Sequence, residues 1–203
     1  NTDGTGFTLL HSFGAGAGPN DGYAPYCTLV TDGTTLYGMG SSSSTGLGTI
    51  FSIDLNGGNY HTLHNFSSAT TDGASPQGSL LLSGGALYGM TQMGGTVAAG
   101  TIFKISTNGT GFQLIHSFSG SDGSHPYGSL IISTSTLYGM TSSGGSNGVG
   151  TVFSVDISGS GFKILHSFSM SDTWGPLGDV TLSGSTLYGM ARNSGLSLLG
   201  FGT

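Results

Sequence analysis

The sequence predicts an all-β fold in which four-stranded antiparallel sheets repeat along the chain. Three observations support this prediction. The block Leu-Tyr-Gly-Met recurs at intervals of 51, 50 and 50 residues, starting at Leu36, Leu87, Leu137 and Leu187. Apolar and polar residues alternate with the period of two that is typical of strands, and helical periodicity is absent. Asp-Gly and Gly-Gly pairs, which supply the positive φ angles of tight hairpins, separate the apolar runs.

Each repeat is expected to contain four strands in a fixed order. The first strand follows a proline turn, as in residues 79–82 and 129–132, and the second is the Leu-Tyr-Gly-Met block. The third strand opens with Gly-Thr and covers residues 48–54, 100–106 and 150–156. The fourth strand covers residues 60–66 and 112–118. Four antiparallel strands every 50 residues are the pattern of a β-propeller blade, because stacked blades bury the faces that a single blade exposes.

We therefore expect residues 1–203 to form one β-propeller-like domain. Its four repeat units are expected at approximately residues 1–47, 48–99, 100–149 and 150–203. A β-solenoid is the alternative, but solenoid coils are usually shorter than 50 residues and the hairpin turns favour a meander. The number of blades in the parent protein stays open.

The fourth strands show the clearest alternation. In the first copy, Phe7, Leu9, His11 and Phe13 are expected to lie on one face of a strand. The chain holds four copies of the first, second and fourth strands but three copies of the third. Either residues 7–13 close a ring with the last repeat, or the repeats belong to a longer array. An unpaired edge of this kind usually invites another chain.

Composition excludes several classes of function. Charged residues make up 6% of the chain, the net charge is −6, and the three cations are Lys104, Lys163 and Arg192. Nucleic-acid binding needs clustered cations, so we expect no nucleic-acid partner. No apolar run reaches the roughly 20 residues that cross a bilayer, so no membrane insertion is expected. The single Cys27 excludes an internal disulfide, and nothing in the sequence indicates a cofactor.

The motifs of the third copy identify a family. They are Gly100-Thr101-Ile102-Phe103, Gly111-Phe112, Ile115-His116-Ser117-Phe118, Asp122-Gly123-Ser124-His125-Pro126 and Leu137-Tyr138-Gly139-Met140. This order resembles the Gloeo-Verruco tandem repeat of secreted bacterial proteins across essentially the whole chain. The resemblance implies an extracellular or cell-surface location and brings no catalytic residues with it. The pattern departs from the family at residues 172–176 and 198–201.

One aspartate precedes each proline turn, and one histidine lies in each fourth strand. The aspartates are Asp21, Asp72, Asp122 and Asp172, and the histidines are His11, His64, His116 and His166. The aspartates could bind calcium or sugar hydroxyls on one rim, or could cap turns by accepting backbone N–H groups. One carboxylate per loop is too few for calcium, so no metal site is expected. We expect a histidine–aspartate hydrogen bond in each repeat, because buried polar groups need partners.

Aromatic residues in the loops before the first strands are the remaining binding candidates. Tyr23, Tyr127 and Trp174 could contact a ligand on one rim, together with the aspartates. Asn65 and Asn108 begin Asn-x-Ser/Thr tripeptides, which match the acceptor pattern for glycosylation.

The sequence predicts a protein that is not an enzyme. Ser and His are neighbours in the His-Ser-Phe motif, and adjacent strand residues point to opposite faces, so they cannot pair as nucleophile and base. We expect a non-catalytic extracellular or cell-surface repeat protein with a structural or adhesive role, including filament formation. Its partners would be further copies or other surface proteins. The alternative is a carbohydrate-binding module, which a cluster of Tyr23, Tyr127 and Trp174 on one rim would favour.

Overall fold

The computed structural model describes residues 2–14, 21–43, 46–67, 69–171 and 173–194. Within these residues the regular secondary structure consists of β-strands, and no helix is long and apolar enough to cross a bilayer. Three four-stranded antiparallel sheets follow one another along the chain, and a two-stranded hairpin comes after them. The all-β prediction is confirmed.

The strands of each sheet are adjacent in the order in which they occur in the sequence. The first sheet contains β2 (Val30–Thr31), β3 (Thr35–Gly40), β5 (Thr49–Asp54) and β6 (His61–Asn65). The second contains β8 (Leu81–Ser83), β9 (Ala86–Thr91), β11 (Thr101–Ser106) and β12 (Gln113–Ser117). The third contains β13 (Ile131–Ser133), β14 (Thr136–Thr141), β15 (Thr151–Asp156) and β16 (Lys163–Ser167). The terminal hairpin contains β18 (Val180–Ser183) and β19 (Thr186–Gly189).

Three small two-stranded sheets, which were not predicted from the sequence, accompany this series in the described residues. Each joins the segment after one of the recurring aspartates to the segment after a Leu-Tyr-Gly-Met block. They pair β1 (Gly22–Tyr23) with β4 (Ser42–Ser43), β7 (Gly73–Ala74) with β10 (Met93–Gly94), and β17 (Thr173–Trp174) with β20 (Asn193–Ser194).

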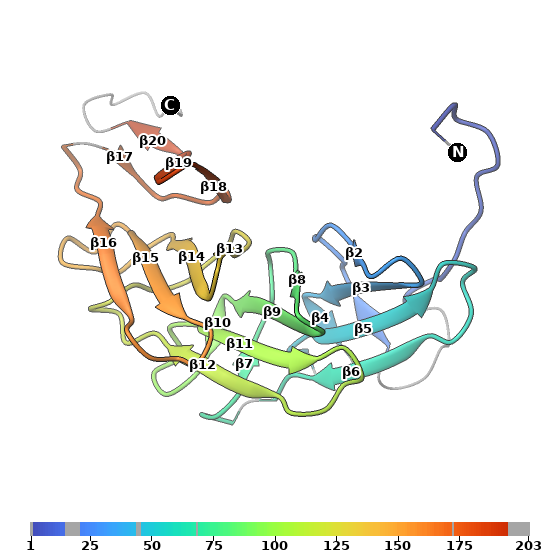
Figure 1. Cartoon of the computed structure of the whole chain (residues 1–203). Coiled ribbons are helices and arrows are strands. Elements are labelled where there is room, and N and C mark those ends of the chain that lie inside the picture. Colours follow the sequence, from blue (N-terminus) through green and yellow to red (C-terminus); the bar gives the residue numbers. More distant parts are fainter. Residues whose placement is uncertain (1, 15–20, 44–45, 68, 172, 195–203) are drawn as a thin grey trace.

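The sheets are arranged along an open arc (Figure 1). The first strands β2, β8 and β13 lie on its concave side, and the last strands β6, β12 and β16 lie on its convex side. Consecutive sheets approach closely near the concave side, where a Cβ atom on Gly78 would collide with the carbonyl of Gly128. A ladder of hydrogen bonds also joins the sheets there. Its bonds run from Thr28 N to Ser79 Oγ (2.8 Å), from Ser79 N to Ser129 Oγ (2.9 Å) and from Ser129 N to Asp179 Oδ1 (2.6 Å).

The expectation for residues 7–13 is wrong in one respect. The described residues there form no strand, and Phe7 and Leu9 are exposed. In the complete sheets, the equivalent strand is held by hydrogen bonds to the third strand, as β12 is held by β11. No third strand lies beside residues 7–13 in the described part of the chain, so the alternating pattern has no ladder to join.

The hydrophobic cores lie between sheets and not within them. One cluster joins Tyr37 and Met39 of the first sheet, and Phe66 directly after it, to Leu87 and Phe103 of the second sheet. Another cluster joins the second sheet to the third in the same way. Each sheet therefore depends on its neighbours for the burial of its apolar side chains.

A phenylalanine of each third strand lies over the glycine of the Leu-Tyr-Gly-Met block. The pairs are Gly38 with Phe51, Gly89 with Phe103 and Gly139 with Phe153, which also face each other in the strand register. A Cβ atom built on these glycines would lie 2.6, 2.5 and 2.7 Å from the ring Cζ atoms. Glycine is required there because any side chain would occupy the space of the ring.

This packing predicts a large loss of stability in the variant Phe103→Ala. Phe103 is fully buried, so its removal leaves a cavity and should lower the free energy of unfolding by about 3–5 kcal/mol. The matched control is Phe7→Ala, because Phe7 is 92% exposed and its removal should change stability by less than about 0.5 kcal/mol. Urea denaturation of both variants measures the difference, and equal losses would contradict the assignment of Phe103 to the core.

Candidate functional site

The junction between consecutive sheets is built around a histidine–aspartate hydrogen bond. Nε2 of His11 lies 2.9 Å from Oδ1 of Asp21, and Nε2 of His64 lies 3.0 Å from Oδ1 of Asp72. In the next repeat, Nε2 of His116 lies 2.9 Å from Oδ2 of Asp122. The expected bond is thus confirmed in three repeats. The fourth would involve Asp172, which lies outside the described residues.

Each of these histidines also stacks on an aromatic ring of the following repeat. The ring of His64 is 3.8 Å from that of Phe112 at an interplanar angle of 5°, and His116 lies 3.9 Å from Phe162 at 7°. His11 stacks on Tyr60 at 4.0 Å. The aspartate orients the imidazole within its own repeat, and the imidazole face then contacts the next sheet. The sequence did not reveal this stacking.

The aspartates also accept bonds from the backbone of the turn that they close. Oδ2 of Asp72 accepts from the Ser67 N–H at 3.0 Å and from its hydroxyl at 2.9 Å. Burial acts to raise the pKa of Asp72, but the bonds from His64, Gly73 and Ser67 together lower it below its ordinary value. For Asp21, burial likewise opposes the bonds from His11 and Gly14, and the net pKa is lowered. These carboxylates are occupied by protein donors.

Two further titratable groups are shifted at these junctions. Burial lowers the pKa of His116, and the neighbouring Asp122 offsets part of that effect. Burial together with the charge of Asp21 raises the pKa of Tyr60 to about 12. Near neutral pH the rings of His116 and Tyr60 are therefore neutral, and the carboxylates of Asp21 and Asp72 are ionised.

The aromatic candidates from the sequence do not form one platform. Tyr23 lies in β1 and Trp174 in β17, so these two exposed side chains belong to the first and the last of the small sheets. Tyr127 is half-buried, and its hydroxyl accepts a 2.6 Å hydrogen bond from Nε2 of Gln92. The three residues thus lie in different repeats.

The two candidate glycosylation residues differ in exposure. Asn65 ends β6 and is half-buried. Asn108 is exposed in a turn, where its Oδ1 accepts hydrogen bonds from the Thr110 N–H at 3.0 Å and from the Thr110 hydroxyl at 2.8 Å.

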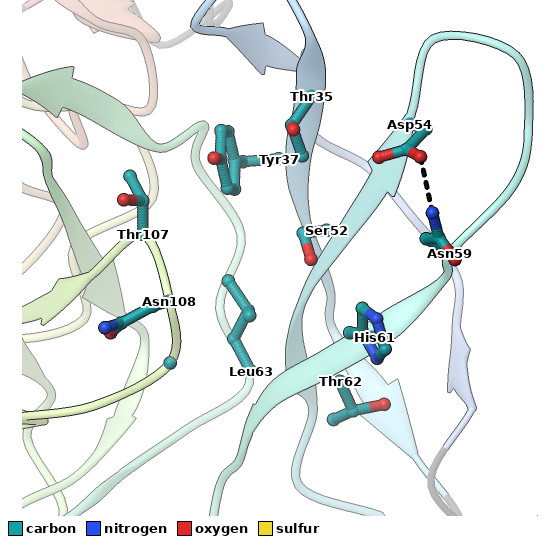
Figure 2. A pocket seen from close by; sticks show the side chains of 11 residues that line it. Thr35, Tyr37, Ser52, Asp54, Asn59, His61, Thr62, Leu63, Thr107 and Asn108 are labelled. Atoms are coloured by element: carbon teal, nitrogen blue, oxygen red, sulfur yellow. Dashed lines mark hydrogen bonds between the residues drawn. The ribbon is translucent and has the colours of Figure 1, made fainter.

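A polar pocket of about 650 Å³ lies between the first two sheets and was missed by the sequence reasoning (Figure 2). Its walls come from β3, β5 and β6 and from the turn at Thr107–Asn108–Gly109 of the next repeat. Asn59 Nδ2 donates a 2.8 Å hydrogen bond to Asp54 Oδ2 at its edge. His61 is exposed and faces Ser52 across the β5–β6 ladder.

The chemistry of this pocket is that of a hydroxyl-binding surface. It offers one carboxylate, two side-chain amides, one imidazole and several hydroxyl groups, which can donate to or accept from a polar ligand. In the part of the chain that the structure describes, no group of three or more His, Cys or Asp side chains is placed to hold a metal ion. The pocket forms where two repeats meet, so no local motif could have indicated it.

Comparisons with known proteins place the chain among repeat proteins. The family model described as the Gloeobacter/Verrucomicrobia repeat matches residues 1–143 and 97–203. A comparison with curated proteins found no match.

Solved structures with β-propeller-like folds resemble the chain. A chain of the nidogen–laminin complex has 16% identity and a TM-score of 0.53, with 79% of this chain and 52% of that chain covered. TolB from Acinetobacter baumannii has 19% identity and a TM-score of 0.48, with 91% and 45% covered. The chain therefore spans about half the length of these structures, and the likeness to the chain of the nidogen–laminin complex shows the fold alone.

The junction predicts that His116→Leu destabilises the protein. The change removes a hydrogen bond to a partly buried carboxylate and should cost about 1–3 kcal/mol. The matched control is His61→Leu, because His61 also lies in the last strand of a sheet but is exposed in the pocket. This variant should lose little stability. Thermal unfolding of both variants measures the effect. A His116→Leu variant with unchanged melting temperature would contradict the structural role.

The pKa shifts predict a loss of stability in acid. The folded-state pKa of His116 is lowered, so the unfolded chain binds this proton more readily and stability falls as the pH drops below about 6.5. The pKa values of Asp21 and Asp72 are lowered too, so their stabilisation is present above about 4 and is lost as the pH falls through their folded values. As the pH is lowered from 8 to 3, the melting temperature should fall in two steps. The step at the higher pH belongs to His116 and should be smaller in the variant His116→Leu. A melting temperature that rises between pH 7 and pH 5 would refute this.

Proposed function

Because the chain belongs to the Gloeobacter/Verrucomicrobia repeat family, we propose that it is a non-catalytic extracellular or cell-surface protein with a structural or adhesive role. It acts by stacking repeat units end to end, either into a closed propeller or into a filament. Its partners are further copies of the repeat or other surface proteins. The single observation that carries this proposal is that the hydrophobic cores lie between sheets, so each sheet buries its apolar side chains against a neighbouring unit.

The exposed surface at the N-terminal side is that of Phe7. This residue occupies the position of Phe112 and Phe162, each of which receives the histidine ring of the preceding repeat. Phe7 is 92% exposed, so its ring is accessible to such a partner.

The exposed surface at the other side is that of β19. Tyr188 is 59% exposed and Met190 is 68% exposed, whereas Tyr88 and Met90 are buried at 3% and 2% against the third sheet. Contact between the exposed surface at one side of one copy and that at the other side of the next copy is head-to-tail, and such contacts form rings or filaments. The low charge of the chain adds little repulsion between copies.

A second candidate function is carbohydrate binding, favoured by the polar pocket between the first two sheets. Its carboxylate, amide and hydroxyl groups suit a sugar, and it is large enough for a small saccharide. A glycan array with His61→Ala and Asn59→Ala as pocket variants tests it. Signals that persist in both variants would exclude this pocket as the site.

The end-to-end proposal predicts concentration-dependent assembly. Light scattering and negative-stain imaging of the untagged protein should show species larger than a monomer, and Phe7→Ser and Tyr188→Ser should each reduce them. Val97→Ser is the matched control, because Val97 is 60% exposed in the turn between β10 and β11, on the second sheet and not on the first or last one. A monomer at all concentrations would overturn the proposal, and equal effects of all three variants would show that the contact is non-specific.

A further inference from the structure

The third-strand phenylalanine of each complete sheet fits a socket made by three apolar positions. For Phe103, these are Gly89 of the second strand, Leu80 just before the first strand, and Phe66 of the preceding repeat, whose ring is 5.5 Å away. Phe153 meets Gly139, Leu130 and Phe118 in the same arrangement, with a ring distance of 5.4 Å. The socket is thus a regular product of the repeat.

At the terminal hairpin, the same three positions occur without a third-strand phenylalanine ring between them. A cavity of about 220 Å³ lies at β18 and β19, and Gly189, Val180 and Phe168 all line it. A Cβ atom on Gly189 would meet the Sδ and Cε atoms of Met140 at 3.1 and 3.2 Å, and no aromatic ring. Because these atoms are the flexible end of a side chain, Met140 can move aside for a ring.

The edge of β19 matches the cavity. In the described residues, β19 pairs with β18 on one side only, whereas β9 pairs with both β8 and β11. The lining residues carry no charged side chain, so the site suits an apolar group attached to an extended backbone. Backbone N–H and C=O groups on such an edge accept a further strand.

We propose that this cavity is a binding site for the phenylalanine of a Gly-Thr-(Ile/Val)-Phe strand from a further repeat of this family. The strand adds antiparallel to the edge of β19, with its phenylalanine opposite Gly189. This register is the one that pairs Gly38 with Phe51, Gly89 with Phe103 and Gly139 with Phe153. The occupant continues the contact already present between the internal sheets.

A labelled peptide with the sequence of residues 100–118 tests this site on the whole chain. It contains the third and fourth strands of one repeat with their turn. Fluorescence anisotropy should show saturable binding, and hydrogen exchange should show new protection of residues 186–191. The peptide variant Phe103→Ala should bind about tenfold to a hundredfold more weakly, because a buried phenylalanine contributes that much to affinity.

The matched protein variants are Gly189→Leu and Thr186→Leu. The leucine at position 189 fills the socket, whereas position 186 lies on the opposite face of the same strand, where the threonine is exposed. Gly189→Leu should lose at least ten times as much affinity as Thr186→Leu. Equal affinities of the two variants, or unchanged binding of the Phe103→Ala peptide, would overturn the site.

This inference rests on the proposed function, since both require contact between repeat units, but the two can fail separately. Peptide binding that depends on Gly189 in a strictly monomeric protein would support the site and overturn self-assembly. Assembly that persists in Gly189→Leu, without any peptide binding, would overturn the site and leave the proposed function standing.

Discussion

The packing of one phenylalanine ring onto one glycine is the constraint on which the structure depends. The ring of Phe103 belongs to the second sheet, yet it contacts Phe66, which follows β6 of the first sheet, as well as Gly89 of its own sheet. The same group thus fixes the register between two strands and the spacing between two sheets. Because the core lies between sheets, stability is a sum over junctions between neighbours, as in other repeat proteins.

The polar part of each junction follows the same logic. An aspartate that only capped its turn would serve one repeat. Here Asp72 also holds His64, and the face of His64 contacts Phe112 of the next repeat. Burying a polar pair without partners would cost free energy, whereas these pairs are satisfied by each other and by the turn. The aspartates at these junctions therefore position side chains that connect two repeats.

The fold could be predicted from the sequence because each strand pattern occurs several times along the chain. Four copies of Leu-Tyr-Gly-Met and the alternation around His116 predicted strands β9, β12 and β14 close to where they lie. It failed at Phe7, where the alternation is equally clear but no neighbouring strand completes the ladder. A strand is a property of a pair, so one segment's pattern is not sufficient to form it.

The polar pocket shows the same limit for the site. Its walls join Asp54 and His61 to the turn at Asn108, which comes from another repeat, and no spacing in the sequence links them. The His–Asp bond could be predicted, because both partners recur once per repeat within about ten residues of each other. Contacts within a repeat can therefore be predicted from the sequence. Contacts between repeats can be predicted only when the relative placement of neighbouring sheets is known.

This difference bears on where the function lies. Internal junctions are closed by their neighbours, and their histidines and aspartates satisfy one another. The exposed groups that match a known internal partner lie at the two ends, at Phe7 and around Gly189. In the proposed function, the surfaces at Phe7 and Gly189 are therefore the ones that meet a further repeat unit. Any partner that reproduces one internal strand can then use a contact that the fold has already made three times.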